Sequence, residues 1–191
     1  MSETFKTLQK TNNNIYENLK PEEYRIVRRR MIEGILATDM ASHSKYLLSL
    51  KSKLESLEIK DGINVEKLIV PDNHSKNYEN QQMILGMCIH TSDLSNPAKL
   101  PEVFDKWTQL VFTEFFNQGV LEQSKNMSIS MLCDRANTKI NKSQVGFINF
   151  VVIPQFNAML NIIPEIQPYL EGIKRNLKRY EVLAKEEENS R

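Results

Sequence analysis

Residues 143–160 read SQVGFINFVVIPQFNAML and form the most apolar helical stretch of the chain. Drawn as a helix, this stretch places apolar side chains on more than one face, which predicts a helix buried on most sides at the centre of the fold. Pro154 lies inside the stretch and has no N–H to donate, so we expect the helix to kink or split there.

Apolar residues recur at spacings near 3.6 through most of the remaining chain, and strict alternation with a period of two is scarce. Pro21 and Pro101 suit the first turns of two helices, and Gly119 predicts the end of the second one. The other expected helices cover residues 40–57, 78–92 and 166–180, with a surface loop over 58–76. The predicted fold class is all-α, a multi-helix bundle.

The chain shows no internal repeat and no flexible linker, so a single helical domain is the simplest interpretation. We expect this domain to cover residues 14–182. Residues 1–13 form an N-terminal lead-in, and the charged residues 183–191 form a tail that we expect to be disordered.

Composition limits the class of protein. A formal net charge of +1 gives no strong field of either sign, which argues against a nucleic-acid partner. No segment approaches the roughly eighteen apolar residues of a membrane span, and the start lacks the apolar core of a signal peptide, so a cytoplasmic protein is expected. Cys88 and Cys133 are interpreted as reduced core thiols, with a disulfide or a metal pair as the alternative.

Residues 88–97, CIHTSDLSNP, place a carboxylate at the end of an apolar helix. Asp, Ser and Asn are favoured helix caps and Pro97 suits the first turn of a new helix. The string can therefore be explained as a junction between two helices. That interpretation does not explain why Asp93 follows a segment as apolar as residues 83–89. A carboxylate carried inward there needs a cation, a metal or several hydrogen-bond donors.

Gln144 is a second polar residue in apolar surroundings. A buried amide needs partners, and its donor and acceptor pair matches the edge of a purine. Phe147 lies on the same helical face and is placed to stack on a base. A core glutamine bonded to nearby backbone is the alternative. Thr38 and Asp39 also interrupt an apolar helix, either as a helix junction or as part of a polar site.

Four strings occur in a fixed order: ILATDM (35–40), HTSDLSNPAK (90–99), WTQLVFTEFFNQG (107–119) and KSQVGFI (142–148). Together they closely resemble the C-terminal half of the catalytic domain of the class I 3',5'-cyclic nucleotide phosphodiesterases. The match reaches from Asn14 to Tyr180. The resemblance therefore implies a partial catalytic domain over residues 14–182 with that family's helical fold.

The resemblance implies a purine pocket. Gln144 matches the glutamine that hydrogen-bonds the purine, Phe147 the ring that stacks on it, and Val111 the residue that clamps its opposite face. Asn96 matches a pocket position that is asparagine in several cAMP-selective members. Further positions that line the pocket in the family match Met40, Phe115 and Leu132.

The resemblance also implies a metal centre. Asp93 matches the aspartate that completes the tighter, usually zinc, site, whereas Thr38 and Asp39 match the stretch that faces the metal-bound water. In the complete domain two divalent ions, Zn with Mg or Mn, activate a hydroxide that attacks the cyclic phosphate, and a histidine protonates the departing 3' oxygen. His90 matches a histidine of the same motif that is not expected to bind metal.

The family's other metal ligands and its general acid stand in strings that begin His-Asn and His-Asp and in a later His-His pair. This chain has only three histidines, His43, His74 and His90, and contains none of these pairs. It therefore supplies Asp93 alone to the metal centre and no general acid, and we expect it to be inactive by itself. The missing N-terminal half of the domain, or a homo-oligomer, is the expected partner.

The implied activity is hydrolysis of a cyclic nucleotide to the 5'-monophosphate, with cAMP favoured over cGMP because of Asn96. Phe104 stands where some cAMP-selective members have a tyrosine that fixes the glutamine amide. Without that hydroxyl, Gln144 is free to turn and accept either base. The alternative is a non-catalytic helical module that binds nucleotide or a protein partner.

Overall fold

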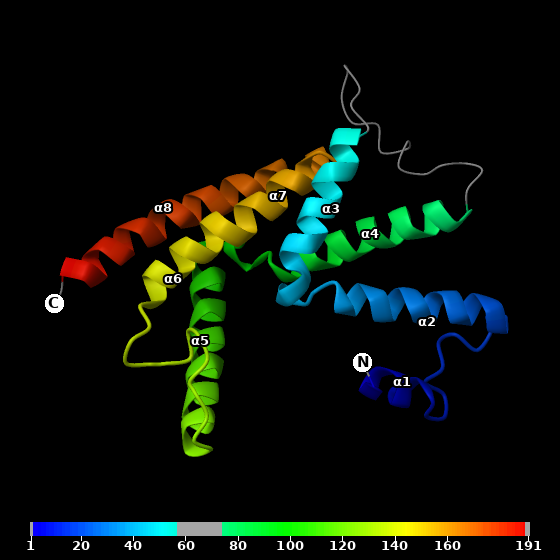
Figure 1. Ribbon diagram of the computed structural model, residues 1–191, viewed down its shortest axis with the longest axis horizontal. Coiled ribbons are helices and arrows are strands. Elements are labelled where there is room, and N and C mark those ends of the chain that lie inside the picture. Colours follow the sequence, from blue (N-terminus) through cyan, green and yellow to red (C-terminus); the bar gives the residue numbers. More distant parts are fainter. Residues whose placement is uncertain (1, 57–73, 190–191) are drawn as a thin grey trace. The chain divides into compact units, whose positions relative to one another are not determined.

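The computed structural model describes residues 2–56 and 74–189, and within these ranges every regular element is helical (Figure 1). The chain divides into two compact units, residues 1–92 and 93–191. None of the helices in the described ranges is both long and apolar enough to span a membrane. The predicted all-α fold class is confirmed.

The first unit is built from α1 (Ser2–Leu8), α2 (Pro21–Leu36), the 3-10 turn η1 (Met40–Ser42), α3 (His43–Ser56) and most of α4 (His74–Asp93). α2 begins at Pro21 as predicted, and the Glu23 carboxylate accepts the Lys20 backbone N–H at 2.8 Å, which satisfies one donor of the helix start. α1 lies in the segment expected to be a lead-in. Glu3 and Lys6 stabilise it through an ion pair one turn apart.

The helix expected over residues 40–57 begins as a 3-10 turn, η1, which Asp39 caps. The Asp39 Oδ1 accepts the Ala41 N–H at 2.9 Å, so the short turn η1 precedes α3. Leu57 and most of the expected loop lie outside the described residues, but α4 already begins at His74, before the predicted loop end. Three leucines of α3 are buried at the predicted spacing: Leu47, Leu50 and Leu54.

A buried pair of histidines joins α3 to α4 in the first unit. His43 is 6% exposed and His90 is 1% exposed, and His43 Nδ1 lies 2.8 Å from His90 Nε2. A hydrogen bond at this distance requires one ring nitrogen to carry a proton and the other to accept it. Burial lowers the pKa of His43 below its usual value of 6.5, so the neutral ring is favoured in the folded state.

The second unit contains, in its described part, η3 (Asn96–Ala98), α5 (Pro101–Ser124), α6 (Ile140–Phe147), η4 (Ile148–Val152), α7 (Ile153–Leu160), η5 (Pro164–Ile166) and α8 (Gln167–Asn189). α5 begins at Pro101 as predicted. α6 and α7 pack along α8 (Figure 1). The core between them consists of Phe104, Ile148, Val152, Phe156, Leu170, Ile173 and Tyr180.

Residues 140–160 form a helical run that changes its hydrogen-bond register before Pro154. The backbone is α-helical to Phe147, widens into a π-helical turn over η4, and is α-helical again from Ile153. Pro154 has no N–H, and its ring clashes with the carbonyl four residues earlier in a regular helix, so the widened turn relieves the conflict. The kink or split predicted at Pro154 therefore takes the form of a change of register within a continuous helical run.

The predicted end of α5 at Gly119 is wrong, because the helix continues to Ser124. Gly119 has a different role. A Cβ at this position would lie 2.0 Å from the Cys133 carbonyl oxygen, so the glycine allows the following loop to approach the helix closely. Cys133 and Cys88 are both free thiols; Cys133 is buried, as expected of a core thiol, whereas Cys88 is only partly buried.

The end of α8 differs from the expected disordered tail over residues 183–191. The helix continues to Asn189, and Lys142 on α6 pairs with Glu188 at 3.0 Å. Alanine, lysine and glutamate favour helix strongly, so the charged composition of this segment does not oppose helix.

We expect protonation of His43 to destabilise the chain. Because its pKa is lower in the folded than in the unfolded state, its contribution to the free energy of unfolding is complete above pH 6.5 and falls as the pH decreases below that value. Urea unfolding at pH 7.5 and 5.5 should show a smaller loss in His43→Asn than in the wild-type chain. Equal losses in both proteins would contradict this assignment.

Candidate functional site

Asp93 is the last residue of α4, and its carboxylate is exposed rather than carried inward as we expected. It lies four residues after Ile89 and eight after Leu85, which are 45% and 42% exposed, and residues four apart share a helix face. The buried positions of α4 lie on another face, which includes Met87 and His90. No hydrogen bond or ion pair within the described chain occupies the Asp93 carboxylate, so it is open to an external cation.

Asn96 opens the turn η3 that separates Asp93 from α5. Its side-chain Oδ1 is buried and has no hydrogen-bond partner in the described part of the chain. An unpartnered buried carbonyl oxygen is unfavourable unless a donor from a ligand or from water reaches it. This position therefore fits an acceptor in a ligand pocket.

Gln144 lies on α6 and is only 7% exposed, yet its side-chain amide bonds to none of the described residues. The structure therefore does not show the alternative considered from the sequence, a core glutamine bonded to nearby backbone. Phe147 follows one turn later, half-buried, and packs against the core of the second unit. Gln144 and Phe147 thus combine an available donor and acceptor pair with an aromatic ring on one helix face.

A common core holds the elements that carry these residues. Ala98 of the turn η3, Phe104 of α5 and Phe147 of α6 all contact the same buried cluster. Packing therefore joins the Asn96 turn to the helix that bears Gln144 within the second unit.

The remaining predicted pocket residues of the second unit lie on α5 and on the loop after it. Val111 and Phe115 are half-buried on α5, and the Phe115 ring meets Phe112 edge-on at 5.8 Å. Leu132 has a backbone φ of 68°, a left-handed conformation that is unusual for a leucine. The neighbouring Cys133 carbonyl rests against Gly119, so this loop is held by α5.

Three predicted site residues belong to the first unit. Thr38 donates its hydroxyl to the Ile35 carbonyl at 2.9 Å, which is a local helix-end contact. Asp39 caps η1 through the Ala41 N–H, so its carboxylate already has a structural role. Met40 is 46% exposed.

An ion-pair cluster links α5 to α8. Arg179 donates two hydrogen bonds to the Asp105 carboxylate, and the Tyr180 hydroxyl donates a third at 2.9 Å. The hydrogen bonds from Arg179 hold the pKa of Asp105 below its usual range, while burial and the bond to Asp105 raise the pKa of Tyr180 to about 12. The Tyr180 ring also packs on Phe104 at 4.9 Å, so the cluster fixes the first turns of α5 against α8.

The described residues bring together no group of three or more His, Cys, Asp or Glu side chains that could hold a metal ion. Asp93 fits the role of one ligand because its carboxylate is exposed and unpaired there. His43 and His90 are buried and bonded to one another. The described chain thus offers one carboxylate ligand at this point.

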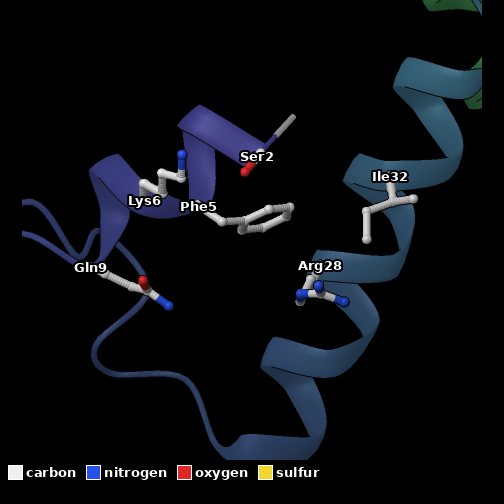
Figure 2. A pocket seen from close by; sticks show the side chains of 6 residues that line it. All are labelled: Ser2, Phe5, Lys6, Gln9, Arg28 and Ile32. Carbon is white, nitrogen blue, oxygen red and sulfur yellow. The ribbon is translucent and has the colours of Figure 1, made fainter.

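Two of the hollows formed by described residues lie in the first unit. One, of about 380 Å³, lies between α1 and α2, where the Phe5 ring faces the Arg28 guanidinium at 4.9 Å (Figure 2). The other, of about 300 Å³, is lined by residues that include Arg29, Glu33 and Tyr78. Neither hollow contains a residue of the predicted site.

Comparison with known proteins identifies the family. The sequence pattern described as 3'5'-cyclic nucleotide phosphodiesterase matches residues 1–173. The chain belongs to this family. The 3',5'-cyclic-AMP phosphodiesterase 4C of Rattus norvegicus is 33% identical to this chain over 178 residues, which are 93% of this chain and 32% of the relative. The probable 3',5'-cyclic-AMP phosphodiesterase pde-4 of Caenorhabditis elegans is 35% identical over 184 residues, 96% of this chain and 26% of the relative.

Solved structures agree with the sequence comparison. The phosphodiesterase domain of the RhoPDE fusion protein from the choanoflagellate Salpingoeca rosetta matches with a TM-score of 0.80 and 30% identity, over 97% of this chain and 55% of that one. LmjPDEB1 in complex with IBMX, at 24% identity and a TM-score of 0.78, shows the same fold. The chain spans about a third of the first curated relative and about half of these solved chains. The resemblance inferred from the sequence is confirmed.

One residue near the site was missed in the sequence. Asn176 is fully buried on α8 and bonds to the segment that follows Asn96. Its position, three residues after Ile173 and four before Tyr180, places an amide on the apolar face of a predicted helix. That is the same signal that identified Gln144.

We expect Gly119→Ala to destabilise the chain by about 1–3 kcal/mol, because the new Cβ would meet the Cys133 carbonyl and displace the Leu132 loop. Gly146→Ala is the matched control, since a Cβ there has no neighbour within 4 Å. Removing a mid-helix glycine should stabilise the chain by about 0.5–1 kcal/mol. Urea unfolding measures both; similar effects of the two substitutions would contradict the close-approach role of Gly119.

Proposed function

We propose that this chain provides the base-binding side of a 3',5'-cyclic nucleotide phosphodiesterase, which hydrolyses the cyclic nucleotide to the 5'-monophosphate when the histidine-bearing part of the domain is present. The observation that carries the proposal is Gln144, a residue only 7% exposed whose side-chain amide has no hydrogen-bond partner within the described chain. Such a group gains most when a ligand with a matching donor and acceptor binds. The half-buried ring of Phe147 on the same face would stack on the base.

We propose that the site favours cAMP over cGMP as its nucleotide. Adenine offers an amino group as a donor beside a ring nitrogen as an acceptor, and the Gln144 amide can pair with both. The unpartnered Oδ1 of Asn96 adds an acceptor that suits the adenine amino group. The relatives named above are cyclic-AMP phosphodiesterases, which supports this choice.

The preference should be moderate. Phe104 is fully buried against the Tyr180 ring and has no hydroxyl that could fix the Gln144 amide in one orientation. The hydroxyl of that neighbouring Tyr180 donates to Asp105 and not to Gln144. An amide that can turn also accepts guanine, whose oxygen and ring N–H reverse the donor pattern.

The metal centre of such a domain would take Asp93 as its ligand from this chain. Two divalent ions, which we propose to be zinc with magnesium or manganese, supply an activated water when bound. A carboxylate oxygen is a suitable ligand for each of these ions, and the Asp93 carboxylate is exposed. A general acid for the departing 3' oxygen must come from outside these residues.

The proposed partner is the complementary part of a phosphodiesterase domain. α5 exposes an apolar stripe in which Val103, Trp107 and Leu110 are 41%, 58% and 49% exposed at spacings of four and three residues. Contiguous apolar surface of this kind marks an interaction site. A second copy of this chain in a homo-oligomer would cover the same stripe. The cytoplasm remains the proposed location, on the grounds of composition.

Gln144→Ala should weaken cAMP binding by the 191-residue chain about 10- to 100-fold, because two hydrogen bonds to the base are lost. Isothermal titration measures the dissociation constant for cAMP and for cGMP. Gln123→Ala, an exposed glutamine on α5, serves as the matched control and should change neither constant. Absence of nucleotide binding in the wild-type chain, or equal binding in Gln144→Ala, would contradict the base-binding role.

The chain alone, with Zn²⁺ and Mg²⁺, should hydrolyse no cAMP above the blank. Mixing it with a purified histidine-bearing segment of a phosphodiesterase domain should restore turnover, and Asp93→Ala should abolish that turnover because a metal ligand is lost. Glu171→Ala, an exposed carboxylate on α8, is the control and should remain active. Turnover by the isolated chain that disappears in Asp93→Ala would refute the requirement for a second segment.

A further inference from the structure

α8 holds three consecutive backbone carbonyls of the segment between Asn96 and α5. The Asn176 amide nitrogen donates to the carbonyl of Pro97 at 2.9 Å and to that of Lys99 at 2.8 Å. The carbonyl between them, of Ala98, faces Gly172, where an added Cβ would lie only 2.9 Å from its oxygen. Segment 97–99 therefore rests on one turn of α8.

The orientation of the Asn176 amide is fixed by these contacts. Both of its N–H groups face carbonyl oxygens, and the reversed amide would place its own oxygen against them. The side chain is fully buried, and its Oδ1 has no partner within the described chain. Burying the unpartnered Oδ1 costs free energy. The two hydrogen bonds that the amide nitrogen donates offset this cost and explain why an asparagine is tolerated in the core.

The segment held in this way controls the direction of Asn96. The turn η3 closes with the Ala98 N–H on the Ser95 carbonyl at 2.9 Å and the Lys99 N–H on the Asn96 carbonyl at 3.0 Å. Fixing the carbonyls of residues 97–99 from outside therefore fixes the backbone of Asn96, and with it the direction of its side chain.

We propose that Asn176, supported by Gly172, is a positioning residue that sets the Asn96 amide for base recognition. This inference rests on the proposed function, because it assigns Asn96 to the base. It adds a determinant of base selectivity on α8, a helix that contributed no residue to the predicted site.

The first experiment tests the contact without any ligand. Amide hydrogen exchange in Asn176→Leu should accelerate at least about tenfold at residues 96, 98 and 99 relative to α6, because two buried hydrogen bonds are lost. Asn161→Leu is the control, since the exposed Asn161 also donates to two backbone carbonyls, those of Asn157 and Ala158, but only to the last turn of α7, which it directly follows. Acceleration spread evenly over the second unit would overturn the proposal.

The second experiment separates positioning from general destabilisation. Asn176→Leu should weaken cAMP binding about tenfold and cGMP binding less, because Asn96 acts on the adenine amino group. A chain that is only less stable would lose both affinities by the same factor, and that result would overturn the proposal. The double variant Asn96→Ala with Asn176→Leu should bind cAMP no more weakly than Asn96→Ala alone, because the two residues act on one contact.

Gly172→Ala provides a milder perturbation if Asn176→Leu does not fold. It keeps the Asn176 amide and pushes only on the Ala98 carbonyl, so the same change in the cAMP to cGMP ratio is expected. An unchanged ratio would overturn the proposal. If the wild-type chain binds neither nucleotide, the proposed function fails, whereas the exchange measurement still decides whether α8 holds the segment.

Discussion

Packing of α8 against the helical run of residues 140–160 is the interaction on which the second unit depends. Ile148 and Val152 come from the widened turn and Ile173 from α8, and all three are fully buried in one core. The same two elements carry Gln144 and Asn176. Apolar burial therefore brings two buried amides into a fixed relation, although neither amide contributes to the hydrophobic driving force.

Prolines were the most reliable guides to the fold in the sequence. Pro21 and Pro101 begin helices, and Pro154 follows a change of helical register, because the missing N–H and the fixed φ act locally whatever the tertiary structure. Gly119 misled for the opposite reason. Gly119 lets the backbone of Cys133, 14 residues later in the chain, approach the helix closely. No local sequence pattern reveals such a contact.

The candidate site shows the same division between local and tertiary information. Gln144 could be found because one amide on an apolar helix is an anomaly visible in the sequence. The exposure of Asp93 could not, since the apolar residues before it occupy two faces of α4 and only the tertiary structure selects the buried one. The Arg179 and Asp105 pair was equally hidden, because its partners lie 74 residues apart.

Leu132 gives the loop after α5 a conformational constraint of its own. A leucine at a φ of 68° is strained by about 1–2 kcal/mol relative to the right-handed region, whereas a glycine would adopt this angle without penalty. The backbone conformation at position 132 therefore favours glycine, and the leucine lowers the stability of the loop. In return the loop carries an aliphatic side chain that glycine lacks. For protein engineering, a glycine at position 132 would relieve the backbone strain but would remove the aliphatic side chain that is proposed to line the pocket.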